Sequence, residues 1–228
     1  MARLVRSRPT PTSVYVETGG KRVFACAVDW PGWCRVAKSE DLALETLAAY
    51  APRYAPVAER AGIRFPTIAT DDLVVVERVA GSTTTDFGVP GSVTKGDARP
   101  IGGEEAERVA ALVEASWRTF DEVVAGAPPE LRKGPRGGGR DRDRIVEHVL
   151  GAEVAYARKL GLRHRQPDRD DTGAIAALRS DILQVLRSES KGEPVVEKGW
   201  PVRYAARRVA WHVLDHAWEI EDRSEPSQ

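Results

Sequence analysis

The segment RRVAWHVLDHAWEIEDR, residues 207–223, places two of the four histidines of the chain four positions apart. On a helix that turns about 100° per residue, His212 and His216 fall roughly 40° apart, on one side. That side also carries the apolar residues of the segment, so we expect both imidazoles to face the interior of the protein. The apolar residues in question are Ala205, Val209, Val213 and Ile220.

Four amphipathic helices are predicted in the second half of the chain. Apolar residues there recur with the helical period of 3.6, and four such helices in succession favour an all-α four-helix bundle. From Ser82 to Gly103 the composition shifts to Gly, Pro, Thr and Ser, which indicates a boundary between two domains, 1–98 and 99–228. The predicted helices span residues 104–125, 143–160, 172–188 and 202–223.

A third histidine is expected in the core of the same bundle. His148 lies on the apolar side of the second helix, beside Ile145 and Ala152. Buried imidazoles are costly unless their nitrogens find partners, so these three are either hydrogen-bonded core residues or ligands of a metal ion. Three neutral imidazoles suit Zn²⁺, with Ni²⁺, Fe²⁺ or Mn²⁺ as alternatives, and they leave a coordination position open.

Acidic and phenolic side chains lie close to the histidines on both helices. Asp215 or Glu219 could accept the second N–H of a ligating imidazole, although both acids could equally be solvated. The sequence shows no obvious general acid, and Tyr156 and Glu219 are the candidates within reach of the three histidines.

The loop LRKGPRGGGRDRDR, residues 131–144, precedes the second helix and combines glycines with arginines. Flexible backbone at a helix N-terminus and nearby guanidinium groups can hold a carboxylate or a phosphate. Arg136 and Arg140 are therefore the candidates for binding a charged thiol or acid. The alternative is a linker in which Asp141 or Asp143 caps the next helix. No G-K-[ST] follows, so nucleotide hydrolysis has no support.

The first 80 residues predict a small α+β domain. Residues 13–38 are rich in β-formers and contain a Gly19–Gly20 hairpin turn, and residues 71–81 return to a strand. Between them, Ser39 is a helix N-cap and Gly62 a stop signal. Pro52 and Pro56 should kink or interrupt this helix, because each removes a backbone donor.

Composition narrows the class of protein. Lys and Arg balance Asp and Glu at 34 each, which argues against a nucleic-acid binder. No apolar run approaches the length of a membrane span, and the N-terminus lacks the apolar core of a secretory signal, so we expect a cytoplasmic protein. Cys26 and Cys34 fit no common zinc spacing and are predicted to be packed thiols, with a disulfide as the minor alternative.

Two stretches resemble known families. IVEHVLGAEVAYARKLG and AWHVLDHAWEIEDR, within residues 104–223, resemble the DinB-like superfamily of four-helix bundles, in which a His on the second helix joins an H-x-x-x-H pair on the fourth. Residues 13–80, with the D-x-P-G turn Asp29–Gly32, are similar to the HicB-like fold. No DNA-binding segment is apparent, so an antitoxin role is not expected.

The DinB-like resemblance implies a divalent metal held by His148, His212 and His216. It also implies a function of the thiol S-transferase type, in which the metal activates a low-molecular-weight thiol such as mycothiol for attack on an electrophile. The expected partners are these small molecules, with neither nucleic acid nor membrane, and a homodimer is a further expectation. The alternative is a non-catalytic binding or regulatory protein whose metal or histidine network is structural.

Overall fold

The computed structural model describes residues 11–134 and 138–224 of the 228-residue chain. The chain divides into two compact units. The first, here called the sheet unit, comprises Met1–Asp29 and Trp33–Ser92, and the second, the helical unit, comprises Trp30–Gly32 and Val93–Gln228. The change of unit after Ser92 lies in the segment whose composition is rich in Gly, Pro, Thr and Ser.

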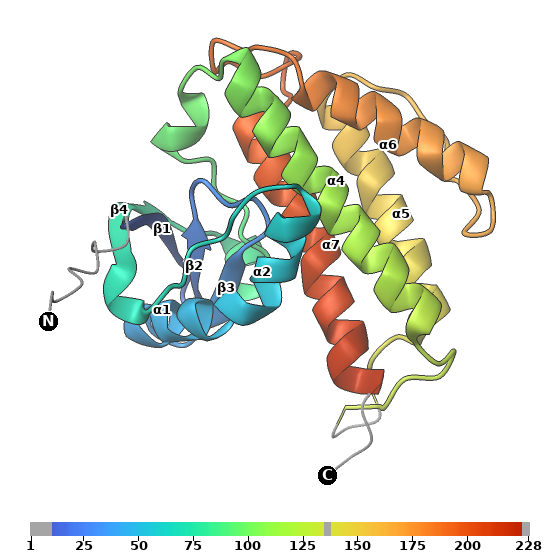
Figure 1. Cartoon of the computed structure of the whole chain (residues 1–228), viewed down its shortest axis with the longest axis horizontal. Helices are drawn as coiled ribbons and strands as arrows, with labels where there is room; N and C mark the ends of the chain where they lie inside the picture. Colours follow the sequence, from blue (N-terminus) through green and yellow to red (C-terminus); the bar gives the residue numbers. More distant parts are fainter. Residues whose placement is uncertain (1–10, 135–137, 225–228) are drawn as a thin grey trace, which may run out of the picture. The chain divides into compact units, whose positions relative to one another are not determined.

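The sheet unit contains a four-stranded sheet in the order β3-β2-β1-β4 (Figure 1). β1 and β2 form the predicted hairpin, whose turn is closed by a hydrogen bond from the Gly19 N–H to the Arg22 carbonyl. β3 continues the antiparallel meander, whereas β4 returns parallel to β1 at the opposite edge. The strands are β1 Thr12–Thr18, β2 Val23–Ala27, β3 Cys34–Ala37 and β4 Leu73–Ala80.

Two helices lie between β3 and β4 in sequence, where one interrupted helix was predicted. α1 spans Glu40–Ala49 and packs against β2 and β3, and α2 spans Ala51–Arg60. The Ser39 side chain caps α1, as expected, by accepting a hydrogen bond from a backbone N–H of its first turn. The interruption falls at Tyr50, two residues before Pro52, which confirms the effect expected of this proline, whereas Pro56 lies inside α2 and does not interrupt it. A 3₁₀ turn, η1 Thr70–Asp72, precedes β4.

The two cysteines form a disulfide, so the prediction of packed thiols is wrong. The antiparallel register of β2 and β3 places Cys26 directly opposite Cys34, with their Cα atoms 4.0 Å apart. Sequence spacing alone did not reveal this pairing, because it depends on which residues face each other across the turn. The turn is fixed by Gly32, whose φ of +94° is a left-handed conformation that glycine adopts readily.

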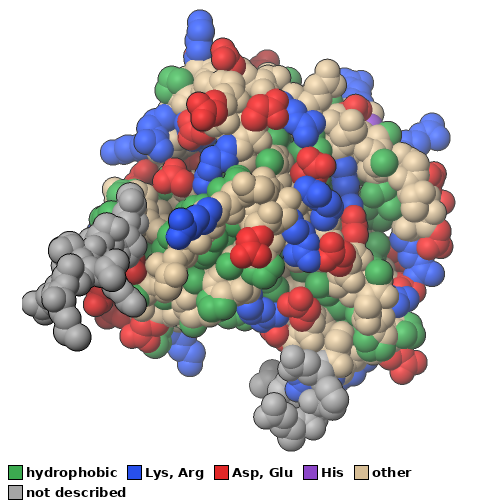
Figure 2. All heavy atoms as spheres, in the orientation of Figure 1, with side chains coloured by type: hydrophobic (Ala, Val, Ile, Leu, Met, Phe, Trp, Pro, Cys, Tyr) green, Lys and Arg blue, Asp and Glu red, His purple; other side chains and the backbone are tan. Residues whose placement is uncertain are grey.

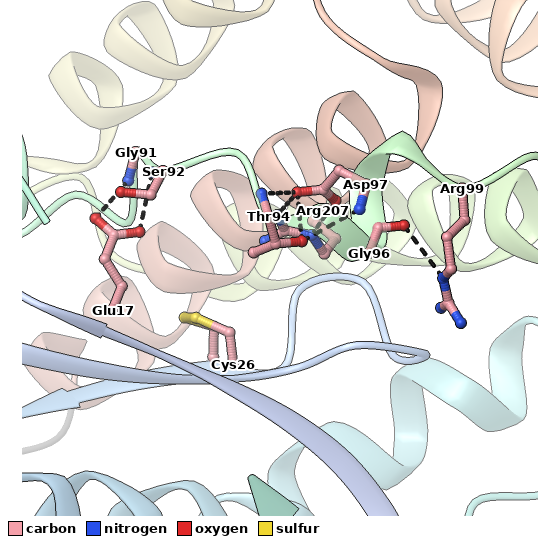
Figure 3. A network of polar contacts seen from close by, with 10 residues as sticks. Glu17, Cys26, Gly91, Ser92, Thr94, Gly96, Asp97, Arg99 and Arg207 are labelled. Carbon is pink, nitrogen blue, oxygen red and sulfur yellow. Dashed lines mark hydrogen bonds and ion pairs between the residues drawn. A yellow bond between two sulfur atoms is a disulfide. The ribbon is translucent and has the colours of Figure 1, made fainter. Parts of the chain in front are cut away.

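A buried carboxylate joins β1 to the end of the sheet unit. Glu17 is fully buried on β1, and its oxygens accept hydrogen bonds from the backbone N–H groups of Gly91 and Ser92 (Figure 3). They also accept a hydrogen bond from Thr85 Oγ1. Thr85 belongs to the short helix α3, Thr83–Asp86. Since all three donors use one acceptor group, Glu17 fixes the whole segment that follows β4.

We predict that Glu17→Ala lowers the free energy of unfolding by about 2–4 kcal/mol, because it leaves three donors without their acceptor. Urea-induced unfolding measures this change. The matched control is Glu45→Ala on the exposed side of α1, which should change the stability by less than about 0.5 kcal/mol. Equal stabilities of the two variants would contradict the role given to Glu17.

The helical unit contains the four predicted helices, whose observed ends agree closely with the predicted ones. α7 packs against α4, α5 and α6, and the four helices share one hydrophobic core (Figure 1). An N-terminal α+β sheet followed by helices is therefore the arrangement of the chain. The four helices are α4 Gly103–Gly126, α5 Arg142–Lys159, α6 Thr172–Leu186 and α7 Val202–Ser224.

Two ion pairs fix the beginning of α7. Arg207 binds Asp97, which is 2% exposed and lies in the short 3₁₀ helix η2, Lys95–Ala98 (Figure 3). Arg203 binds both carboxylate oxygens of Glu105 in the first turn of α4. Paired arginines of this kind combine electrostatic attraction with a defined geometry, so they set where α7 starts relative to α4.

The surface carries charges of both signs. In Figure 2, Lys and Arg side chains are intermixed with Asp and Glu side chains over the visible face, in keeping with their equal numbers. Among the described residues, no helix combines the length and the apolar character that crossing a membrane requires.

Candidate functional site

The structure brings the three predicted histidines together in the helical unit. His148 projects from α5, and His212 and His216 project from consecutive turns of α7. Their ring centroids lie 5.1 Å (148–212), 5.0 Å (148–216) and 4.7 Å (212–216) apart. The cluster forms because α5 packs against α7, so that His148 of α5 meets the two histidines of α7.

The donor atoms of the cluster fit a single divalent ion. One nitrogen from each of the three rings lies within 4.8 Å of the others, and the Nε2 atoms of His148 and His212 are 3.2 Å apart. A tetrahedral zinc site with Zn–N distances of about 2.1 Å places its ligand nitrogens roughly 3.4 Å apart. The 148–212 pair already lies close to this spacing, and ring movements of up to about 1.4 Å would bring the third nitrogen to it.

Glu219 and Arg223 orient His216. The ring Nδ1 of His216 donates to Glu219 Oε2 at 2.8 Å, and Arg223 Nη1 donates to Glu219 Oε1 at 2.7 Å. A proton held on Nδ1 leaves the lone pair on Nε2, which is the form in which an imidazole binds a metal. The predicted acceptor role of Glu219 is therefore consistent with the geometry, whereas Asp215 is half-buried on the neighbouring side of α7.

His212 is the most enclosed of the three histidines. Only 6% of its surface is exposed, and its Nδ1 atom is buried without a hydrogen-bond partner among the described residues. The facing Nε2 atoms of His148 and His212 satisfy each other only if one ring donates and the other accepts. The protein alone thus leaves the nitrogens of this cluster incompletely paired, which is costly at a buried position.

Both partners of this pair are held in the neutral state that ligands need. Burial lowers the pKa of His148, the neighbouring His216 and Arg140 lower it further, and Glu219 acts in the opposite direction. Burial also holds the pKa of His212 well below its usual value, with His216, Arg208 and Arg140 acting in the same direction. A neutral imidazole presents a lone pair to a cation, whereas a protonated one repels it.

Tyr156 lies beside the cluster. Its ring centroid is 5.7 Å from that of His212, and the Arg208 guanidinium carbon lies 5.4 Å from the Tyr156 ring centroid. Burial raises the pKa of the Tyr156 phenol, and the positive charge of Arg208 partly offsets this effect. Tyr156 is therefore a protonated hydrogen-bond donor at neutral pH. Sequence reasoning missed Arg208, although its position one helical turn before His212 was a usable signal.

Of the two predicted anion-binding arginines, the structure describes one. Arg140 is exposed, and its charge acts on His148 and His212. Arg136 lies outside the described residues. Asp141 is the N-cap residue of α5, but its side chain accepts hydrogen bonds from Leu131 N–H and Lys133 Nζ instead of capping the helix.

A second polar cluster was not predicted. Glu153 on α5 is fully buried and accepts hydrogen bonds from Trp117 Nε1 of α4 and from Arg179 of α6. Arg179 also binds Asp121. Burial raises the pKa of Glu153, opposed by Arg179. This cluster joins three helices, and its members are too far apart in sequence for spacing to indicate them.

A cavity of about 410 Å³ opens between α4, α5 and α6. It is lined mainly by apolar side chains, among them Phe120 and Val146, with Asp121, Arg169 and Arg179 contributing charges of both signs. On α5, Val146 and His148 point about 160° apart around the helix axis. The cavity therefore lies on the side of α5 away from the histidines.

The chain was compared with known proteins by sequence and by structure. No protein-family model, curated protein or solved structure matches it. The candidate function therefore depends on the residues of this chain and on their geometry.

We predict that the purified protein binds about one equivalent of Zn²⁺ or Co²⁺, and that His212→Ala abolishes this binding, because it removes one of only three protein ligands and leaves two imidazoles to hold the ion. Elemental analysis and metal titration measure the stoichiometry. Glu219→Ala should weaken the affinity for the metal by about 10- to 100-fold, since it removes the acceptor that keeps the proton on His216 Nδ1.

The matched control is the fourth histidine. His164 Nε2 pairs with Asp181 Oδ2 at 2.9 Å, outside the cluster. His164→Ala should leave the stoichiometry and the affinity unchanged. A wild-type protein that binds no metal, or a His164→Ala variant that loses metal together with His212→Ala, would refute the site.

A pH dependence is predicted for the metal-free protein. In the unfolded chain His148 and His212 take up protons near pH 6.5, whereas burial lowers the pKa of both in the folded state. Their contribution to stability is thus present above this pH and is lost as the pH falls. Between pH 7.5 and 5.5 the free energy of unfolding should decrease more for wild type than for His148→Gln/His212→Gln. Parallel curves would contradict this.

Proposed function

We propose that this protein is a metal-dependent enzyme of the DinB-like thiol-transferase type. In this proposal a divalent ion, Zn²⁺ in the first instance, is held by His148, His212 and His216. It activates a low-molecular-weight thiol, for example mycothiol, toward an electrophilic substrate. The observation that carries the proposal is the convergence of three imidazoles whose donor atoms lie within 4.8 Å.

Two further features of the helical unit support the proposal. The histidines come from the second and the fourth of four packed helices, with the fourth contributing an H-x-x-x-H pair. Three protein ligands also leave a tetrahedral ion one open position, which is the arrangement of catalytic rather than structural zinc. All three ligands belong to one chain, so the proposed site does not depend on a homodimer.

The proposed chemistry needs few groups. A divalent ion held by the histidines would supply a positive charge that lowers the pKa of a thiol in the open position. The thiol gives its proton to solvent, and its sulfur forms a bond to an electrophilic carbon. The bond from that carbon to the leaving group breaks, and the electron pair departs with the leaving group.

Protein side chains assist this reaction in different ways. Tyr156, protonated and close to His212, is suited to donate a hydrogen bond to a substrate oxygen on which negative charge develops during the reaction. Both oxygens of Glu219 are engaged by His216 and Arg223, so we propose that Glu219 positions His216 and is not the general acid. The catalytic role considered for Glu219 from sequence is thereby replaced by a positioning role.

The rival function is a non-catalytic binding or regulatory protein. One observation favours it: His212 is 6% exposed and lies against the rings of Tyr156 and Trp211. In this function, an ion bound beside the enclosed His212 would hold α5 and α7 together and would not take part in a reaction. Access of a thiol to the ion separates the two functions.

The sheet unit is proposed to be of the HicB-like type. The support is its element order, with three strands and two helices followed by a strand that returns beside the first. We further propose a cytoplasmic location, where small thiols are abundant. The Cys26–Cys34 disulfide is more typical of oxidising compartments, so it stands against this part of the proposal.

The thiol proposal is tested with the cobalt-substituted full chain. Because a thiolate that binds Co²⁺ produces an intense charge-transfer absorption, mycothiol or 2-mercaptoethanol should generate such a band in a saturable manner. Tyr156→Phe should bind the thiol normally and transfer it more slowly, by about 10²-fold or more for a group that stabilises developing charge. His164→Ala is the matched control. A cobalt protein that no thiol perturbs would leave the structural role as the remaining explanation.

A further inference from the structure

The main chain of the loop before α5 is bound to the end of α7. Arg223 Nε donates to the Arg132 carbonyl at 2.8 Å, and the Arg132 N–H donates to the Arg223 carbonyl at 3.0 Å. Gly139, with φ +112°, lies so close to Arg223 that a Cβ atom there would be 2.7 Å from Nη2. Only glycine permits this approach, and the residue after it is Arg140.

Arg140 thus follows a glycine that packs against Arg223, whose guanidinium binds the Glu219 partner of His216. It is exposed, and among residues 11–134 and 138–224 its guanidinium makes neither an ion pair nor a hydrogen bond. Arg223, in contrast, is bound by Glu219 and by the Arg132 carbonyl. Its Nη2 atom is nevertheless buried without an acceptor among the described residues.

The charges around the cluster are unbalanced. Beside the neighbouring His216, Arg140 acts on His148 and His212, Arg208 acts on His212, and Glu219 is the acid that acts on His148. Since Glu219 is itself paired with Arg223, its charge is largely compensated. A divalent ion would add two positive charges to this excess. Such a field attracts anions and disfavours cationic ligands.

We propose that the three-histidine site takes a ligand bearing a carboxylate, and that Arg140 holds this carboxylate while Arg223 positions the Arg140 segment. This inference rests on the proposed metal site and names its ligand class. The ligand has one atom that binds the ion and a carboxylate a few bonds away. Either the activated thiol or the electrophilic substrate can bring the carboxylate, and the experiment separates these two sources.

Two thiols of similar length and opposite charge test the proposal on the cobalt-substituted full chain. The 3-mercaptopropionate ion should bind at least about tenfold more tightly than 2-mercaptoethylamine, with neutral 2-mercaptoethanol between them. Arg140→Gln should reduce this preference to about threefold or less, because the attraction of the ion alone remains. Arg140→Lys should restore part of it.

The matched control is Arg165→Gln, which removes another exposed arginine that is not among the groups acting on His148 and His212. It should keep the full preference. A preference that persists in Arg140→Gln, or that is absent from the wild type, overturns the inference and leaves thiol activation intact.

Propionate, which has a carboxylate but no thiol, tests the carboxylate contact by itself. Calorimetric titration should detect its binding to the wild type and a loss of about tenfold or more in Arg140→Gln. If propionate binds in this way and no thiol perturbs the cobalt, the carboxylate belongs to the substrate and thiol activation fails. Should the protein bind no metal, the proposed metal site and this inference fail together, and elemental analysis identifies that case separately from a loss of the Arg140 contact alone.

Discussion

The helical unit depends on how its core accommodates polar rings between α5 and α7. Around His148 and His212, the neighbouring core residues Ile145, Val149 and Val213 are almost completely buried. Apolar packing brings the two helices together, yet it also removes water from the imidazoles, whose nitrogens then need partners. The packing of the hydrophobic core therefore buries imidazole nitrogens, and their binding partner is either a shared cation or a proton shared between two rings.

Helix α5 carries buried polar groups on two of its sides. One side carries His148 toward α7, and another carries Glu153 toward Trp117 and Arg179. The two polar clusters restrict the same helix in rotation and in translation, since a shift of one residue would expose one group and bury another unpaired. An apolar α5 would have many near-equivalent packings, whereas this one has few.

Much of the helical unit was predictable, and the reason is its periodicity. The apolar period of 3.6 identified α4 to α7, and the spacing of His212 and His216 indicated their shared side. In the sheet unit, Ser39 marked the start of α1 correctly and Pro52 the start of α2, whereas Pro56 lies inside α2. Contacts between distant segments were not predictable. The Cys26–Cys34 pairing required the strand register, and the positions of Arg223 and Glu153 required the packed helices.

The position of Glu17 in the chain has a consequence for synthesis. Its hydrogen-bond partners Gly91 and Ser92 come 74 and 75 residues later, and β4, the neighbour of β1, also arrives late. A nascent chain emerges from its N-terminus, so β1 leaves the ribosome long before the groups that complete it. We therefore expect the first three strands to wait, incompletely paired at one edge, until translation has passed Ser92 and the helical unit has begun to appear.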